Sequence, residues 1–420
     1  MMRTGIFFIY KNFRLVNNNA LSIFAANVDR LLICVLRDET RYSTQCLARR
    51  KTSDVVLNAH VDVEREFVAR FAQLNHGVAQ LSMFYLPALL SLLHEHAVTD
   101  CALPFHPSYD LSRMWLSLRE KCQNMRFHSL PGNTLFQEYE LPFKSDSFPK
   151  TFSDFRRKVN DITIAENLTS QLPDLPRSVL PVCSDRHPVV KAKHGESAAA
   201  QHLLDYFCSR HPSHYKETRN QLSGEWFSTG FSPFLALGTV NVHEILSRLQ
   251  EYQLVYGQTD STEWIYFELL WREYFYWYAK AHGIKLFLRR GLNSINPPSS
   301  FYAPTFKTWC EGKTESDLVN AIMKELNTTG WISNRARQIT ASYLVNELGI
   351  DWRHGAAYFE QTLIDYDVAI NWGNWQYIAG VGADPRGGRH FNIDKQTQLY
   401  DELGHYRRQW LKEHNTERSL

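Results

Sequence analysis

One predicted helix carries a carboxylate among large aromatic rings. Trp264, Glu268 and Trp271 recur at helical spacing within residues 261–281, and Arg272 follows Glu268 by one turn. Burying a carboxylate among indoles is costly unless a partner receives it. Two interpretations are open: a core helix with a Glu268–Arg272 ion pair, or the wall of a cavity on which a flat ring stacks.

Polar and aromatic residues also alternate in two later segments. Asn334 and Arg337 lie one turn apart, and the segment 365–377 combines carboxylates, amides and large rings within thirteen residues. Such a mixture seldom forms a plain core, because every buried polar atom needs a partner. A ligand site is one interpretation. The other is purely structural, with Asp365 paired to Arg337 and Asp367 capping a helix.

A third segment has the composition of an anion cradle. Ser228, Thr229 and Ser232 surround Gly230, directly before an apolar helix. Ser232 suits the N-cap of that helix and Pro233 its first residue. Hydroxyls beside free backbone N–H groups bind phosphate well, although a well-capped helix alone also explains the pattern.

Different elements must position these residues. Over residues 1–128, apolar runs at 6–10 and 31–36 are followed by amphipathic stretches at 61–74 and 85–96, a pattern that predicts an open α/β domain with a parallel sheet. No Gly-x-Gly-x-x-Gly sequence follows the first strand, which argues against a dinucleotide bound there.

The rest of the chain is organised differently. Residues 129–195 are rich in proline and predict a long connector with one short helix at 152–159. The segment 196–420 predicts an all-α domain, and ten of the eleven tryptophans lie in it. We expect its helices over 196–210, 233–251, 261–281, 315–326, 332–348, 353–364 and 394–413.

Composition narrows the functional classes. Lys and Arg number 46 against 44 Asp and Glu, so a nucleic acid could be met only by a local basic patch. The seven cysteines form no Cys-x-x-Cys pair, which argues against a disulfide framework or a metal site and favours a reducing compartment. No apolar run reaches the ~18 residues of a membrane span. We therefore expect a cytoplasmic monomer without a bound metal.

Three motifs resemble those of the cryptochrome/photolyase family: ELLWREYF at 268–275, TGWISNRARQITASYL at 329–344 and IDYDVAINWGNWQYIAGVGADPRGGRHFN at 364–392. Gln338, the GNWQY sequence and AGVGADPR at 379–386 are similar to the DASH branch. The resemblance is strong over residues 200–405. It is looser in the N-terminal third, where KNFRLVNNNAL at 11–21 and TLFQEYELPF at 134–143 carry it.

The resemblance implies one FAD, folded into a U inside the helical domain. Residues at the pyrophosphate and ribityl positions are Tyr215, Ser228, Thr229 and Ser232. Residues at the isoalloxazine positions are Glu268, Arg272, Asn334, Arg337, Asp365, Asp367 and Asn371. In this arrangement Asp367 accepts from the flavin N3–H and Asn371 lies near N5.

The family also contacts a flipped-out cyclobutane pyrimidine dimer. The matching positions are Glu268, Trp271, Asn334, Gln338 and Tyr377, with Trp271 and Tyr377 sandwiching the rings. Arg386, Arg389 and Lys395 are candidates for contacts with flanking phosphates. The implied enzyme is a deoxyribodipyrimidine photolyase, a carbon–carbon lyase that repairs dimers in single-stranded DNA by electron transfer from excited reduced FAD.

Two other functions remain open. A blue-light photoreceptor would keep the FAD and signal without repairing DNA. A plain flavoprotein oxidoreductase is disfavoured, because no nicotinamide fingerprint accompanies the flavin residues.

The sequence departs from the family at two places. Trp375 and Trp352 match the inner two residues of its electron relay, but Ser299 stands at the outer position, where Tyr302 is the nearby side chain that can be oxidised. The family's folate antenna, methenyltetrahydrofolate, is bound by a glutamate where this chain has Tyr109 and Asp110. Because aspartate is one methylene shorter, we expect the folate to bind weakly or not at all.

Overall fold

The computed structural model describes residues 2–38, 52–164, 168, 172–182, 191–293, 296–383 and 388–412. Its N-terminal part is a parallel sheet with the strand order β3-β2-β1-β4-β5. These strands are β1 (Thr4–Ile9), β2 (Arg30–Arg37), β3 (Val78–Ser82), β4 (Asp100–Pro104) and β5 (Arg126–Leu130). The predicted α/β architecture is confirmed.

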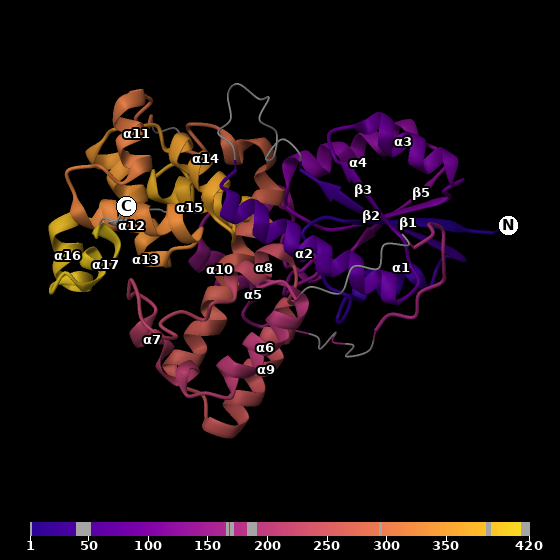
Figure 1. Cartoon of the computed structure of the whole chain (residues 1–420), viewed down its shortest axis with the longest axis horizontal. Helices are drawn as coiled ribbons and strands as arrows, with labels where there is room; N and C mark the ends of the chain where they lie inside the picture. The colour runs from indigo at the N-terminus through magenta and orange to yellow at the C-terminus, as the bar shows by residue number, and fades with distance from the viewer. Residues whose placement is uncertain are drawn as a thin grey trace, which may run out of the picture.

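Helices cover both faces of this sheet (Figure 1). They are α1 (Asn19–Ala25), α2 (Asp54–Gln73), α3 (Leu86–Glu95) and α4 (Tyr109–Lys121). Successive strand side chains point to opposite faces, so Phe7 packs with α1 and α2 whereas Phe8 packs with α3 and α4. Every residue of β1 is therefore buried.

The segment after β5 runs over both parts of the molecule. It contains the 3₁₀ turns Glu138–Glu140 and Ser145–Ser147 and the short helix α5 (Phe152–Val159), which has the predicted bounds. It also returns to the sheet, because β6 (Arg177–Ser178) pairs in parallel with β2 at Arg30 and Leu31. This strand was not predicted, because two residues show no periodicity.

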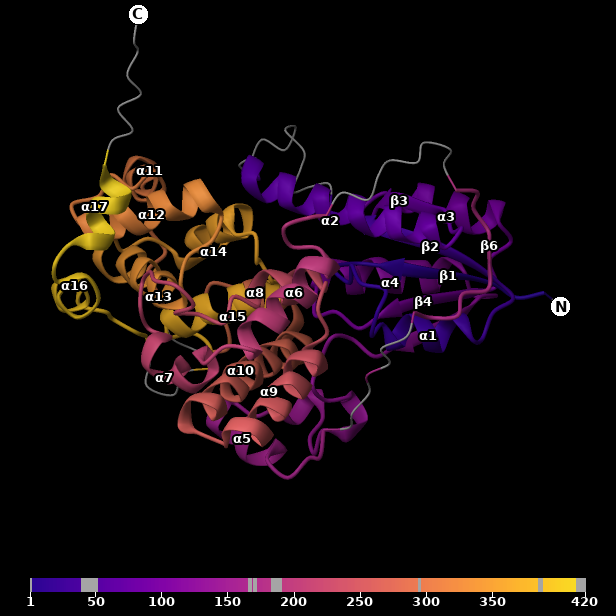
Figure 2. The ribbon, with the colours of Figure 1, turned by 60° about the horizontal axis from the view of Figure 1, so that its bottom comes forward.

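The C-terminal part is helical, as predicted. Its helices are α6 (Glu196–Phe207), α7 (Tyr215–Thr218), α8 (Ser232–Leu237), α9 (Val242–Tyr256), α10 (Asp260–His282), α11 (Ala303–Glu311), α12 (Asp317–Thr329), α13 (Asn334–Ser342), α14 (Trp352–Thr362), α15 (Val368–Ile378), α16 (Ile393–Asp401) and α17 (His405–Leu411). Short 3₁₀ turns lie at His211–His214 and Gly283–Phe287. Figure 2 shows α16 and α17 at the end of the molecule far from the sheet.

Several helix boundaries differ from the prediction. The helix expected over 233–251 is two helices, because Gly238 ends α8 in the left-handed region (φ 68°) and Asn241 caps α9. Gly404, with the same φ, separates α16 from α17. The helix expected over 332–348 closes in a π-helical turn at Tyr343–Glu347.

In the helical part, α7 and α11 were not predicted, and α15 was expected only through the interpretation that Asp367 caps a helix. Helix α15 is buried on most of its circumference, at Val368, Asn371, Trp375 and Ile378 among others, so it lacks the one-sided apolar stripe that reveals a surface helix.

Candidate functional site

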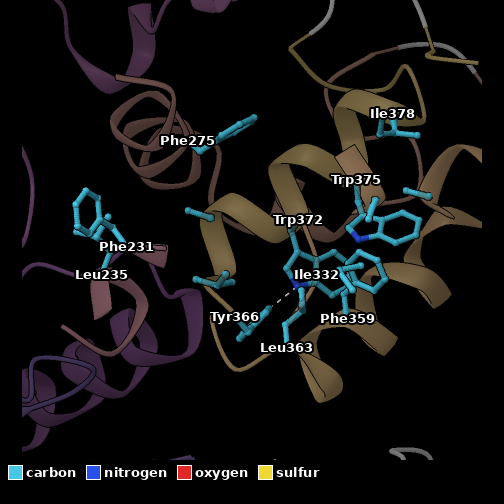
Figure 3. Close-up of a cluster of buried hydrophobic side chains, with 14 of the residues drawn as sticks. Phe231, Leu235, Phe275, Ile332, Phe359, Leu363, Tyr366, Trp372, Trp375 and Ile378 are labelled. Carbon is cyan, nitrogen blue, oxygen red and sulfur yellow. Dashed lines mark hydrogen bonds between the residues drawn. The ribbon is translucent and has the colours of Figure 1, made fainter. Parts of the chain in front are cut away.

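A cavity of about 370 Å³ lies inside the helical domain, between α8 and α10 on one side and α13, α14 and α15 on the other. Figure 3 shows Phe231, Leu235 and Phe275 at one side of this space and Ile332 and Phe359 at the other. Every predicted cofactor and lesion residue lines it: Tyr215, Ser228, Thr229, Ser232, Glu268, Trp271, Arg272, Asn334, Arg337, Gln338, Asp365, Asp367, Asn371 and Tyr377.

The segment with Ser228, Thr229 and Ser232 lines the cavity at the start of α8. Ser228 Oγ accepts from Gly230 N–H, and Ser232 Oγ accepts from Trp331 Nε1–H at 3.2 Å. Ser232 is the first helical residue and Phe231 the N-cap, one position from the prediction. Tyr215, from α7, is buried at the same end, and burial raises the pKa of its hydroxyl.

Glu268 does not pair with Arg272, so the expected ion pair is wrong. Arg219 donates to Glu268 Oε1 instead, and Trp264 Nε1–H donates to the same oxygen at 3.1 Å. Burial raises the pKa of Glu268, and the Arg219 guanidinium partly offsets this effect. The Glu268 side chain remains 28% exposed, and the residue lines the cavity.

Arg272 points toward the connector. Its Nη1 donates to the Asn133 carbonyl at 2.7 Å, and its guanidinium lies 4.2 Å from the Tyr276 ring centroid. Its Nη2 is buried and has no hydrogen-bond partner in the structure. The second nitrogen is thus a donor that the described protein atoms leave unused.

Asp365 and Asp367, which we expect to face a flavin, both have hydrogen-bond partners within the protein. Arg337 Nη2 donates to Asp365 Oδ2 at 2.7 Å, and Asp365 is fully buried on its side chain. Asp367 caps α15 by accepting from Ala369 N–H and Ile370 N–H. Both structural interpretations of these residues are therefore confirmed. They do not exclude a ligand, since Asp365 Oδ1 is buried and has no hydrogen-bond partner among the described residues.

Asp367 has a further partner that the sequence did not reveal. Tyr276 O–H donates to Asp367 Oδ2 at 2.6 Å. Burial favours the neutral acid, but the nearby His106 and Lys11, together with the Tyr276 hydrogen bond, outweigh it and leave the pKa of Asp367 below its ordinary value. The site thus holds an ionised carboxylate.

Trp271 and Tyr377 stand nearly perpendicular, with ring centroids 6.1 Å apart and an interplanar angle of 79°. They form an L-shaped pair of surfaces. Trp271 also lies flat on Phe152 of α5, with centroids 3.8 Å apart. The Tyr377 hydroxyl accepts a hydrogen bond from Arg389.

The remaining polar residues differ in how they are held. Asn371 Nδ2 donates to the Ala356 carbonyl at 3.0 Å. Asn334, exposed at the start of α13, and Gln338, half-buried one turn later, make no side-chain hydrogen bond within the described ranges. Their amide groups are available to a ligand.

The two expected relay tryptophans occupy different environments. Trp375 lines the cavity and contacts Phe359 and Trp309, at 5.1 and 6.4 Å between ring centroids. Trp352 lies outside the cavity lining, where its ring contacts Trp372 at 5.7 Å. At the outer end Tyr302 is 65% exposed.

The fit to an FAD can be tested on these atoms. A buried donor on Arg272 and a buried acceptor on Asp365 both belong to residues that line the cavity, and neither has a partner in the part of the chain that the structure describes. Leaving such buried groups unpaired is costly. A ligand with both a carbonyl and an N–H group would satisfy them. The aromatic and aliphatic walls around them suit a flat ring.

Comparison with known proteins agrees with this site. The family described as "FAD binding domain of DNA photolyase" matches residues 264–418. A Cryptochrome DASH of Idiomarina loihiensis is 40% identical, covering 97% of this chain and 92% of its own length. This chain belongs to the DASH branch of the cryptochrome/photolyase family.

Other DASH cryptochromes and solved structures extend the comparison. A Cryptochrome DASH of Vibrio parahaemolyticus is 40% identical over 97% of this chain and 93% of its own length. The crystal structure of a Synechocystis cryptochrome has a TM-score of 0.84 and 31% identity, covering 98% of this chain and 89% of that one. A class III photolyase of Agrobacterium tumefaciens, 22% identical with a TM-score of 0.77 over 98% of this chain and 87% of that one, shares the fold. The helical domain of this DASH protein is thus an FAD-binding domain of the photolyase type.

Several expectations concern residues outside the cavity. Tyr109 and Asp110 begin α4, where the Tyr109 ring contacts Phe287. Arg386 lies outside the described residues. Within the described ranges no helix is long and apolar enough to cross a bilayer, and no group of three or more His, Cys, Asp or Glu side chains could hold a metal ion.

Proposed function

We propose that this DASH protein is a light-dependent deoxyribodipyrimidine photolyase that repairs cyclobutane pyrimidine dimers in single-stranded DNA. The main support is that the residues predicted to bind the lesion and the cofactor come from separate segments and line one cavity. Its walls hold buried polar groups that find no partner among the described residues. When bound, reduced FAD excited by blue light supplies one electron to the dimer and recovers it after the cyclobutane ring opens.

The chain's own residues would bind and orient the cofactor. The unpaired Arg272 Nη2 and Asp365 Oδ1 would hydrogen-bond the isoalloxazine edge, with Arg337 holding Asp365 in place. Asp367 Oδ2 accepts from Tyr276 and retains one lone pair for the flavin N3–H. Ser228, Thr229 and Ser232, near the start of α8, would hydrogen-bond the pyrophosphate.

The lesion would lie on the L-shaped pair formed by Trp271 and Tyr377. Two linked pyrimidines are not coplanar, and perpendicular rings offer each of them a surface. Glu268 would accept from a base N–H, and Asn334 and Gln338 would donate to base carbonyls. Arg219 fixes the Glu268 carboxylate.

A preference for single strands follows from energetics. Flipping a base from a duplex costs a few kcal/mol, and the cost is least in single-stranded DNA. Stacking on aromatic side chains recovers about 1–3 kcal/mol per base. Arg389 and Lys395 would hold flanking phosphates, so binding would weaken as salt is added.

The test uses chemically reduced, FAD-loaded protein under blue light with a dimer-containing single-stranded oligonucleotide. We expect restored thymines, little repair of duplex DNA, and a greater loss of repair than of FAD in Glu268→Gln. Glu263→Gln is the matched control, because Glu263 is exposed on the same helix and does not line the cavity. FAD-loaded protein that leaves the dimer intact would refute repair and support the blue-light photoreceptor instead.

A further inference from the structure

A lysine of the α/β domain reaches the wall of the flavin cavity. Lys11 follows β1, and its Nζ donates to the Tyr366 carbonyl at 2.7 Å across the domain boundary. The ammonium also lies 4.7 Å from the Tyr366 ring centroid. Tyr366 separates Asp365 from Asp367, so this cation contacts the middle of the acidic segment that lines the cavity.

The backbone around Lys11 is fixed by a second cavity element. Lys11 adopts the left-handed region (φ 48°), which is uncommon for a residue with a Cβ. Its carbonyl packs against the end of α8 so closely that a Cβ on Gly238 would lie 2.2 Å from it. Phe13 N–H donates to the Leu237 carbonyl two residues later. The backbone that carries the Lys11 side chain is therefore fixed against the end of α8.

We propose that Lys11 is a positioning residue through which the α/β domain holds Asp367 in the FAD site. The inference rests on the proposed FAD-binding function and goes further by making the N-terminal domain part of that site. The Tyr366 carbonyl belongs to the planar peptide unit that also contains Asp367 N. Holding this carbonyl fixes the orientation of that peptide immediately before Asp367 caps α15.

Charge supports the same arrangement. Lys11 is one of the cations that favour the ionised form of Asp367, together with Arg272. His106 also comes from the α/β domain, directly after β4, and its ring contacts Tyr276, the residue that donates to Asp367. Two residues of the sheet domain thus act on one carboxylate of the helical domain.

The experiment measures FAD dissociation constants for the full chain carrying Lys11→Met, Lys11→Arg or Lys11→Gln. We expect roughly tenfold weaker binding in Lys11→Met, the size of one lost charge-assisted hydrogen bond. Lys11→Arg keeps a charged donor and should bind FAD nearly as well as the unsubstituted protein. Lys121→Met, an exposed position at the end of α4, is the matched control and should change nothing.

A double-mutant cycle separates positioning from general destabilisation. If Lys11 acts through Asp367, Lys11→Met should add little to the loss already caused by Asp367→Asn. Independent, multiplicative losses, or unchanged FAD binding in Lys11→Met, would overturn the inference and leave the proposed function standing.

Two other outcomes are also decisive. If the unsubstituted protein does not bind FAD, the proposed function fails and this inference fails with it. If Lys11→Met does not fold, the remaining pair carries the test: Lys11→Gln should bind FAD more weakly than Lys11→Arg, and equal affinities would overturn the inference.

Discussion

Replacing Asp367 by Ala should weaken both the fold and the FAD site, whereas Asp367→Asn should mainly affect the site. The alanine variant loses the cap of α15, worth about 1 kcal/mol, and leaves the buried Tyr276 hydroxyl unpaired, at about 1–3 kcal/mol. We therefore expect the free energy of unfolding to fall by roughly 2–4 kcal/mol. The asparagine variant keeps one oxygen for the cap, but it loses the charge and places an amide NH2 in place of the oxygen that accepts from Tyr276.

Urea denaturation of the FAD-free protein and titration with FAD measure these effects separately. The control is Ser316→Ala, which removes the cap of α12 at a residue that does not line the cavity. It should cost about 1 kcal/mol of stability without changing FAD affinity. An alanine variant at position 367 that is as stable as the unsubstituted protein, or binds FAD as tightly, would refute the reasoning.

The same residue predicts a pH dependence. Because the pKa of Asp367 is lowered in the folded protein, ionised Asp367 stabilises the fold above about pH 4, the ordinary range of an aspartate, and this contribution is lost as pH falls below it. In Asp367→Asn this part of the acid destabilisation should be absent. Urea midpoints compared between neutral and acidic pH measure it.

Three further predictions concern other parts of the chain. If exposed Tyr302 is the outer electron donor, both Tyr302→Phe and Trp375→Phe should abolish light-driven reduction of bound FAD. Bleaching of the flavin absorbance measures this reduction. Unchanged bleaching in Tyr302→Phe would exclude Tyr302 as the donor. Burial raises the pKa of Glu325 to about 7, so the stabilising contribution of the protonated Glu325 side chain is lost as pH rises through that value. Glu325→Gln should therefore flatten the pH profile of urea midpoints. An unaltered profile would show that Glu325 does not cause this pH dependence. In Gly355→Ala the new Cβ would lie 2.2 Å from the Trp375 ring. We expect the free energy of unfolding, measured by denaturant titration, to fall by roughly 1–3 kcal/mol. Undiminished stability would show that Trp375 moves freely.

Local sequence signals were sufficient for the architecture. Apolar runs separated by amphipathic stretches predicted the α/β domain, and α5 and α10 lie where periodicity indicated them. Interleaved polar and aromatic residues identified the segments that line the cavity. These signals are local, because strand and helix periods are properties of neighbouring residues.

Local periodicity did not predict where helices are interrupted, nor the extent of helix α15, which is buried on most of its circumference. Gly238 and Gly404 end helices through a left-handed conformation that glycine permits but does not require. Helix α15 has no one-sided stripe, because protein surrounds it.

The sequence by itself thus determined the family, the two kinds of domain and many of the polar residues that line the cavity. Tertiary structure alone decided how these residues are paired. Glu268 meets Arg219, 49 positions away, rather than Arg272, and Trp271 lies on Phe152. The physical reason is that such contacts depend on how distant elements pack, and no local period encodes that packing.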